Sequence, residues 1–277
     1  MIKSPLNYIG GKYKLLPQIL PLFPADINTF VDLFAGGLDV ALNVKANRIV
    51  CNDINYYVIR MFEYFQQNDI EELIARIHEV IDDYALSKQN QSGFLDLREE
   101  YNTNHSPLHL FLLICYGFNH QIRFNNQGYF NNPFGRNRSS YNANIERNLR
   151  QMHERLQSVE FRMENFKHFN IGFMQHNDFL YADPPYLITC GTYNDGKRGF
   201  EGWTANDDAV LFALLDELNA KGVRFALSNV IKHKGVENIQ LMEWATRYVT
   251  NYLEKSYANS NYQAHITETV EVLITNY

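Results

Sequence analysis

The residues best suited to chemistry form the run Tyr181-Ala182-Asp183-Pro184-Pro185-Tyr186. The apolar residues from Phe179 to Ala182 predict a short buried strand. The two prolines lack backbone N–H donors and have a fixed φ, so the strand has to end there in a stiff bend. In an open α/β sheet, ligands bind beyond the carboxyl ends of the strands. The bend therefore presents a carboxylate, backbone carbonyls and an aromatic ring to a predicted ligand site.

These groups suit the capture of a flat base whose exocyclic amine has to react. An adenine amine is a poor nucleophile because its lone pair is delocalised into the ring. The Asp183 carboxylate and the Pro184 carbonyl could accept its two N–H hydrogens and favour a more nucleophilic nitrogen. Tyr186 could stack on the ring, which contributes about 1–3 kcal/mol per base. The candidate catalytic residues are thus Asp183, Pro184, Pro185 and Tyr186, and an ordinary strand with a Pro-Pro turn is the competing interpretation.

A second candidate site follows two earlier strands. The stretch from Thr29 to Phe34 predicts a strand that ends in Ala35-Gly36-Gly37, before a helical stretch from Leu38 to Val44. Strand, glycine turn and helix together are typical of nucleotide binding in a doubly wound sheet. The glycines do not form Gly-x-Gly-x-x-Gly, which disfavours a nicotinamide-dependent oxidoreductase.

Asp53 closes the next predicted strand, Arg48 to Asn52. An acidic residue at this spacing from the glycine turn can accept hydrogen bonds from the hydroxyls of a ribose. The alternative is a helix N-cap. Near the N-terminus, Gly10-Gly11 precedes Lys12, which indicates either a plain turn or a close backbone approach to a ligand with a cation beside it. A helix is predicted from Tyr13 to Leu20, with its regular start near Pro17, because proline is tolerated in a first turn.

The middle of the chain is predicted to be helical, from Tyr56 to about Ser106 and from Pro107 to Tyr116. Residues 117–138 then mix asparagines and arginines with aromatic residues, around an Asn-Gln-Gly stretch typical of a β-hairpin tip. Over residues 121–155, six arginines and two glutamates give 6 − 2 = +4, in a chain of net charge −6. Such side chains can contact base edges and phosphates or insert between base steps, and the alternative is a solvated polar loop.

The C-terminal third alternates between helical and strand patterns. Residues 191–202 carry four glycines and predict a mobile loop near the site. The other predicted elements are helices at 206–220 and 241–245 and strands at 223–229, 248–253 and 269–274, the last two as a possible terminal hairpin.

Composition narrows the class of protein. The chain has 277 residues, of which 45% are hydrophobic and 20% charged, as in globular proteins. No apolar run approaches membrane-spanning length and the first residues lack the apolar core of a signal peptide, so no membrane association is expected. Cys51, Cys115 and Cys190 fit neither a disulfide framework nor zinc spacing, which predicts a cytoplasmic protein without a metal.

The order of these motifs resembles that of the Dam-type DNA adenine-N6 methyltransferases. The matching stretches are Asn7 to Lys12, Asp32 to Gly37, Asn52-Asp53 and Asp183 to Tyr186. The phage Dam branch is the most similar, through residues 30–38 and 183–189. The resemblance implies an α/β fold: a Rossmann-like S-adenosylmethionine-dependent methyltransferase sheet of seven mostly parallel strands, with a helical plus β-hairpin DNA-recognition insert. Residues 1–55 and 156–277 would form the catalytic domain and residues 56–155 the target-recognition insert.

The resemblance also assigns roles to residues. It implies that Tyr8 and Lys12 help to bind S-adenosylmethionine, and that Asp53 holds its ribose. The remaining implied cofactor contacts are Phe34, Ala35 and Gly36 at the methionine end, Asn165 and Phe166 at the adenine, and Asp183. The predicted DNA contacts are Phe118 and Asn119 in the gap left by a flipped base, Arg123 on a guanine and Arg136 near the phosphates, together with Asn125 and Arg138 of the same segment.

The expected reaction is direct transfer of the methyl group from the sulfonium to the N6 amine of an adenine flipped out of double-stranded DNA. The family's usual target is GATC, although Asn7 stands where bacterial members carry a lysine that contacts a base. Two alternatives stay open: methylation of another amine, such as cytosine N4 or a glutamine side chain, and an inactive relative that only binds DNA. A monomer or weak dimer is expected.

Overall fold

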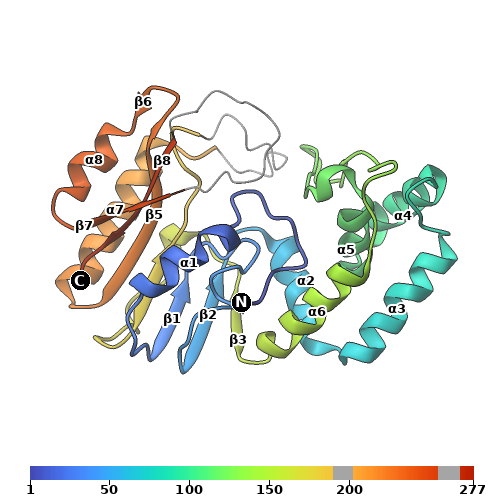
Figure 1. Ribbon diagram of the computed structural model, residues 1–277, viewed down its shortest axis with the longest axis horizontal. Coiled ribbons are helices and arrows are strands. Elements are labelled where there is room, and N and C mark those ends of the chain that lie inside the picture. Colours follow the sequence, from blue (N-terminus) through green and yellow to red (C-terminus); the bar gives the residue numbers. More distant parts are fainter. Residues whose placement is uncertain (190–201, 255–268) are drawn as a thin grey trace.

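A single β-sheet runs through the centre of the computed structural model (Figure 1), which describes residues 1–189, 202–254 and 269–277. Within these ranges the sheet has eight strands in the order β3-β2-β1-β4-β5-β8-β7, with β6 paired to β5. The strands are β1 (Thr29–Asp32), β2 (Arg48–Asn52), β3 (Val159–Arg162), β4 (Phe179–Ala182), β5 (Arg224–His233), β6 (Val236–Glu237), β7 (Val249–Leu253) and β8 (Thr269–Thr275).

The five neighbouring strands β3, β2, β1, β4 and β5 run parallel to one another, and β8 is antiparallel to both of its neighbours, β5 and β7. This arrangement confirms the predicted α/β class with a mostly parallel sheet, and the short β6 adds a strand to the seven expected. The predicted pairing of the two C-terminal strands is also confirmed. The predicted mobile loop falls outside the described residues except for Gly202.

The strands are continuous apolar runs because both faces of the sheet are covered. Phe30 and Phe179 face one layer, and their rings lie 5.8 Å apart between centroids because the two residues are in register. Val31 and Leu180, one residue further along each strand, face the other layer. Each layer therefore takes alternate residues of the same strands.

The helices are divided between the two layers (Figure 1). The second layer contains α7 (Ala205–Ala220) and α8 (Ile239–Ala245), together with the 3₁₀ turn η4 (Phe166–His168). The first layer begins at the sheet and continues into a helical bundle. Its elements are η1 (Tyr13–Leu15), α1 (Leu16–Ile19), η2 (Leu20–Leu22), α2 (Tyr56–Gln67), α3 (Ile70–Asp83), α4 (Gln91–Asn104), α5 (Pro107–Tyr116), η3 (Phe118–His120) and α6 (Ala143–Leu156).

The bundle and the sheet share one hydrophobic cluster. Phe62 on α2 stacks on Phe161 of β3 at 6.0 Å between centroids, and α5 runs buried through the middle of the bundle. Ser106 caps α5 by accepting a hydrogen bond from the His109 N–H, and Pro107 occupies its first position. These signals are local, which explains why the bounds of α5 match the prediction. The assignment of residues 56–155 as a recognition insert stays a prediction.

Two stretches near the N-terminus differ from the helices predicted for them. The helix expected from Tyr13 to Leu20 is divided into η1, α1 and η2. Its regular part, α1, begins at Leu16 with Pro17 in the first turn, as expected, and Pro21 lies in the first turn of η2. The stretch from Leu38 to Val44 forms turns instead of a helix, since Leu38 adopts a left-handed φ of 67°.

The predicted hairpin between the bundle helices forms only in part. Gly128 donates its N–H to the Asn125 carbonyl at 2.9 Å, which closes the expected turn. Phe124 and Phe130 beside it make one antiparallel bridge, and no strand extends from them in this described segment. Pairing between the two arms of the hairpin stops here because the Asn102 side-chain oxygen accepts the Phe130 N–H at 2.7 Å.

None of the helices in the part of the chain that the structure covers has both the length and the apolar character needed to cross a membrane.

Candidate functional site

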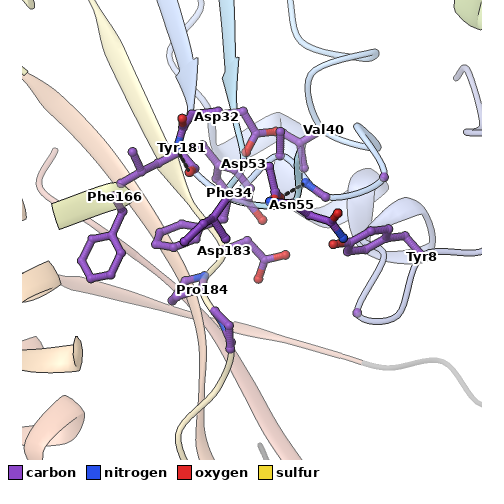
Figure 2. A pocket seen from close by; sticks show the side chains of 18 of the residues that line it. Tyr8, Asp32, Phe34, Val40, Asp53, Asn55, Phe166, Tyr181, Asp183 and Pro184 are labelled. Carbon is purple, nitrogen blue, oxygen red and sulfur yellow. Dashed lines mark hydrogen bonds between the residues drawn. The ribbon is translucent and has the colours of Figure 1, made fainter. Parts of the chain in front are cut away.

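A cavity of about 340 Å³ lies at the carboxyl ends of β1, β2 and β4 (Figure 2). In this view, Asp32, Asp53 and Asp183 surround the same hollow, with Phe166 toward one side and Tyr8 toward the other. All the predicted catalytic and cofactor residues line the cavity, and none of the predicted DNA contacts does. The lining set includes Tyr8, Lys12, Phe34, Ala35, Gly36, Asp53, Asn165, Phe166, Asp183, Pro184, Pro185 and Tyr186.

Asp183 follows β4 directly and is held by two donors. Its Oδ2 lies 2.7 Å from the Lys12 Nζ, and its Oδ1 accepts the Tyr186 hydroxyl proton at 2.8 Å. Burial raises the pKa of the Asp183 carboxyl above its usual range, while the Lys12 ammonium acts in the opposite direction. The carboxylate is thus oriented but partly desolvated, as an acceptor for a substrate hydrogen requires.

Tyr186 is buried, with 7% of its surface exposed. The Lys12 Nζ lies 5.1 Å from its ring centroid, a cation–π contact. The same hydroxyl that bonds Asp183 also lies 3.1 Å from Oε1 of Glu271, a β8 residue absent from the predicted site. Stacking of this ring on a base stays a prediction.

Asp53 organises the glycine turn after β1. Its Oδ2 accepts the Gly36 N–H and its Oδ1 accepts the Asn55 N–H, both at 2.8 Å. The N-cap position of α2 belongs to Asn55, so Asp53 is not the helix cap considered as the alternative. Gly36 has a φ of +47°, and a Cβ there would lie 3.0 Å from the Tyr8 ring, so glycine is required on both counts.

Asp32 is a cavity residue that the prediction did not include, although it lies in a motif carrying the resemblance. It ends β1 with 2% of its surface exposed, and its Oδ1 has no hydrogen-bond partner within the described ranges. Burial raises its pKa well above the usual range, and the Asp183 and Asp53 carboxylates add to this effect. Asp32 therefore gives the cavity a site suited to a cationic group.

Asp32→Asn is expected to change how stability depends on pH. The raised pKa means that the folded protein binds this proton more tightly than the unfolded chain, so the contribution is present below pH about 4 and is lost as pH rises through the folded pKa. The variant lacks this ionisable group, so its free energy of unfolding should fall less than that of the wild-type protein as pH rises above about 4, the pKa of an unfolded aspartate.

Urea denaturation over this pH range measures the effect, and Asp96→Asn on the exposed side of α4 is the control. Equal pH dependence in both variants and the wild-type protein would contradict the assignment.

An aromatic wall closes one side of the cavity. Trp203 lies 5.7 Å from Phe34 and 5.2 Å from Phe166 between ring centroids, and its Nε1 donates to Asp208 at 2.8 Å. Trp203 is not among the predicted residues, because it belongs to none of the motifs identified in the sequence. The three rings pack against one another and thus offer the cavity an apolar wall on which a flat heterocycle can lie.

The Asn165 side-chain oxygen accepts the Lys167 N–H at 3.0 Å and thereby begins η4.

The predicted DNA contacts lie on the segment between α5 and α6. Phe118, Asn119, Arg123, Arg136 and Arg138 are exposed. The Arg138 guanidinium lies 5.4 Å above the Phe118 ring, and Arg136 donates to the Gln91 side chain at 2.9 Å.

Asn125 belongs to the same set but has a structural task. Its side-chain oxygen accepts the Gln127 and Tyr129 N–H groups and shapes the turn, so that oxygen is already engaged.

The positive charge predicted over residues 121–155 does not form one patch. Arg150 on α6 pairs with Glu71 at 2.5 Å and with Glu146 at 3.1 Å, and Arg155 donates to the Val44 carbonyl. The exposed arginines at 123, 136 and 138 remain as candidates for phosphate and base contacts.

Family comparison decides the class of protein. The sequence profile of the D12 class N6 adenine-specific DNA methyltransferases matches residues 8–270. The chain belongs to this family. The predicted resemblance is therefore confirmed at the level of the family, and the assignments of individual residues stay predictions.

The chain is similar to modification enzymes of two named systems. It is 50% identical to the type II methyltransferase M.FokI of Planomicrobium okeanokoites and 50% identical to the modification methylase StsI of Streptococcus sanguinis, each over 280 residues. These alignments cover all of this chain but only 43% of each relative, so the chain spans less than half of their length. A DNA adenine methylase of Vibrio cholerae is 28% identical over 81% of this chain and 80% of its own length. The Dam-type relatives are thus less similar than these modification methylases.

Proposed function

We propose that this protein transfers a methyl group from S-adenosylmethionine to the N6 amine of an adenine in double-stranded DNA. The observation that carries the proposal is one continuous cavity lined by both the Asp183-Pro184 bend and the Gly36 turn. A methyl donor on the glycine turn and an amine at the bend would share that space. Family membership supports the choice of adenine N6 over cytosine N4 or a protein glutamine.

The cavity residues fit S-adenosylmethionine. The aromatic wall of Phe34, Phe166 and Trp203 suits an adenine ring. The Asp53 carboxylate lines the same cavity, where it can accept hydrogen bonds from ribose hydroxyls. Asp32, buried and with an oxygen lacking a partner among the described residues, suits a cationic methionine end. When bound, the cofactor would supply a methyl group on a positively charged sulfur.

The bend would position the amine. The Asp183 carboxylate and the Pro184 carbonyl each accept one N–H hydrogen, which holds the nitrogen lone pair toward the glycine turn. Lys12 favours the ionised form of Asp183, which is the form able to accept. Asp183 is also the base within reach of the proton that the amine loses on methylation.

The substrate has to leave its duplex to reach this buried bend. Extrusion of a base costs a few kcal/mol, and side chains that fill the gap offset part of it. Phe118, with 39% of its surface exposed, and the neighbouring Asn119 are the side chains we assign to that task. We also propose that the protein is cytoplasmic, because its proposed substrate is DNA.

Sequencing of N6-methylated adenines in DNA from a methylation-free host that expresses the chain tests the proposal. A modified adenine in one short sequence context is expected, with GATC as the context that the Dam resemblance predicts. Absence of modified adenine would contradict the activity, and a different context would contradict GATC alone.

Arg123→Ala is expected to weaken binding of a target duplex by about 1–3 kcal/mol, because a bidentate arginine–guanine contact contributes that much. Arg150→Ala makes the same change of charge at a site paired with Glu71 and is the control. Fluorescence anisotropy at fixed salt measures both affinities, since salt alone shifts them strongly. Equal losses in the two variants would argue against base recognition by Arg123.

A further inference from the structure

A further buried carboxylate lies behind the proposed active site. Glu271 belongs to β8, 85 residues beyond Tyr186 in sequence, and only 2% of its surface is exposed. Its Oε1 is 3.1 Å from the Tyr186 hydroxyl and 3.7 Å from the Lys12 Nζ. Glu271 does not line the cavity, so any effect on the substrate has to pass through Tyr186 and Lys12.

Asp183 and Glu271 compete for the same two donors. Tyr186 has one hydroxyl proton, and carboxylate oxygens of both residues lie within 3.1 Å of its oxygen. Lys12 lies 2.7 Å from Asp183, 3.7 Å from Glu271 and 2.9 Å from the Gly10 carbonyl. In this structure, Asp183 has the shorter contact with each donor.

An amine that binds Asp183 has to displace at least part of these contacts. Lys12 has only 5% of its side chain exposed, and a buried cation that loses its partner is strongly destabilising. Glu271 offers the lysine and the tyrosine a second acceptor close to their present positions. A short shift of both hydrogen bonds would free the Asp183 oxygens without moving the Tyr186 ring.

We propose that Glu271 is a positioning residue that takes over the Lys12 and Tyr186 donors when Asp183 accepts the target amine. This inference rests on the proposed methyl transfer at Asp183. It assigns a role in turnover to the antiparallel strand β8, none of whose residues is among the described residues that line the cavity.

Glu271→Gln in the full chain separates this role from simple support of the fold. Glutamine can still accept the Tyr186 proton, but it lacks the charge that Lys12 requires. We expect kcat for methyl transfer to fall by about 10–100-fold while KM for DNA and for S-adenosylmethionine changes little, the pattern of a group that acts only after substrates bind. Glu237→Gln on β6 makes the same change at an exposed site and should match the wild-type protein.

The pH profile of kcat supplies a readout that a structural role would not change. The groups acting on Asp183 are Lys12, Tyr186, Glu271 and, through their own couplings, Asp32 and Tyr181. Glu271 raises the pKa of Asp183 through its negative charge. The acid limb of the profile should therefore move to lower pH in Glu271→Gln and return to its wild-type position in Glu271→Asp, which restores the charge.

The outcomes distinguish this inference from the proposed function. No adenine methylation by the wild-type protein would overturn the function itself. Wild-type activity with an unchanged kcat and an unchanged acid limb in Glu271→Gln would overturn only the role of Glu271. If Glu271→Gln does not unfold cooperatively, Glu271→Asp decides, because it keeps the charge but withdraws the carboxylate from Lys12 and Tyr186. A lowered kcat with a wild-type acid limb supports the role, and a wild-type kcat overturns it.

Discussion

Asp183→Ala is expected to abolish methyl transfer while S-adenosylmethionine still binds. The variant removes the carboxylate that would polarise the amine, and loss of one such preorganised group typically lowers kcat by about 10²–10³-fold. The proposed cofactor contacts at the Asp53 turn and at the aromatic wall of Phe34, Phe166 and Trp203 would remain. Single-turnover transfer of a tritiated methyl group measures the chemical step, and isothermal titration calorimetry measures cofactor affinity.

The control for this experiment is Asp82→Ala, an exposed aspartate on α3 that lies outside the cavity lining. It should show wild-type values in both measurements. Near-normal turnover of Asp183→Ala would refute the assignment of the acceptor. Loss of cofactor binding together with activity would instead place Asp183 chiefly in the cofactor site.

Lys12→Met is expected to have the largest effect on stability. It removes the cation that lies against Asp183 and Glu271 in a nearly dry environment. Breaking such a buried pair by removing one partner typically costs about 3–5 kcal/mol. Without the lysine, the pKa of Asp183 should rise further, because the lysine opposes the effect of burial.

The sign of the pH effect follows from that shift. A carboxyl whose folded pKa is raised destabilises the protein above that pKa and ceases to do so once it is protonated, so the loss in Lys12→Met should shrink as pH falls toward about 5. Urea denaturation at neutral pH and at the lower pH measures this loss of stability, with the exposed Lys45→Met as control. A loss below about 1 kcal/mol at neutral pH would mean that the pair contributes little to folding.

The sequence predicts those parts of the site whose signals are local. The bend at Asp183 follows from an apolar strand that two prolines terminate, and the structure places it at the cavity. The Gly36 turn and Asp53 follow from strand ends that parallel pairing brings to the same edge of the sheet. Neither inference requires knowledge of distant contacts.

Contacts between distant segments were not predictable in the same way. Glu271 reaches Tyr186 because β8 inserts between β5 and β7, a topology that no local pattern encodes. The left-handed φ of 67° at Leu38 is likewise not indicated by the stretch from Leu38 to Val44, which predicts a helix. The bond from the Gln127 N–H to the Asn125 side chain is a further contact that the sequence does not indicate, and the contact of Asn125 with DNA stays a prediction.

The loop that carries the predicted DNA contacts is tied to the N-terminal segment that leads into the cavity. The Asn7 side chain donates to the Asn119 carbonyl at 3.1 Å, across 112 residues of sequence. Asn119 and His120 both adopt a left-handed φ, of 53° and 54°, so the turn between α5 and the arginines has a defined shape. Asn7, at the position where the resemblance places a base-contacting lysine in bacterial members, thus holds this turn.

The most direct test of methyl transfer to adenine N6 is to incubate the purified chain with duplex DNA and S-adenosylmethionine and to analyse the digested DNA by mass spectrometry. We expect N6-methyladenine with the wild-type protein and none with Asp183→Ala. Methylation of cytosine alone, or equal N6-methyladenine from both proteins, would contradict this expectation.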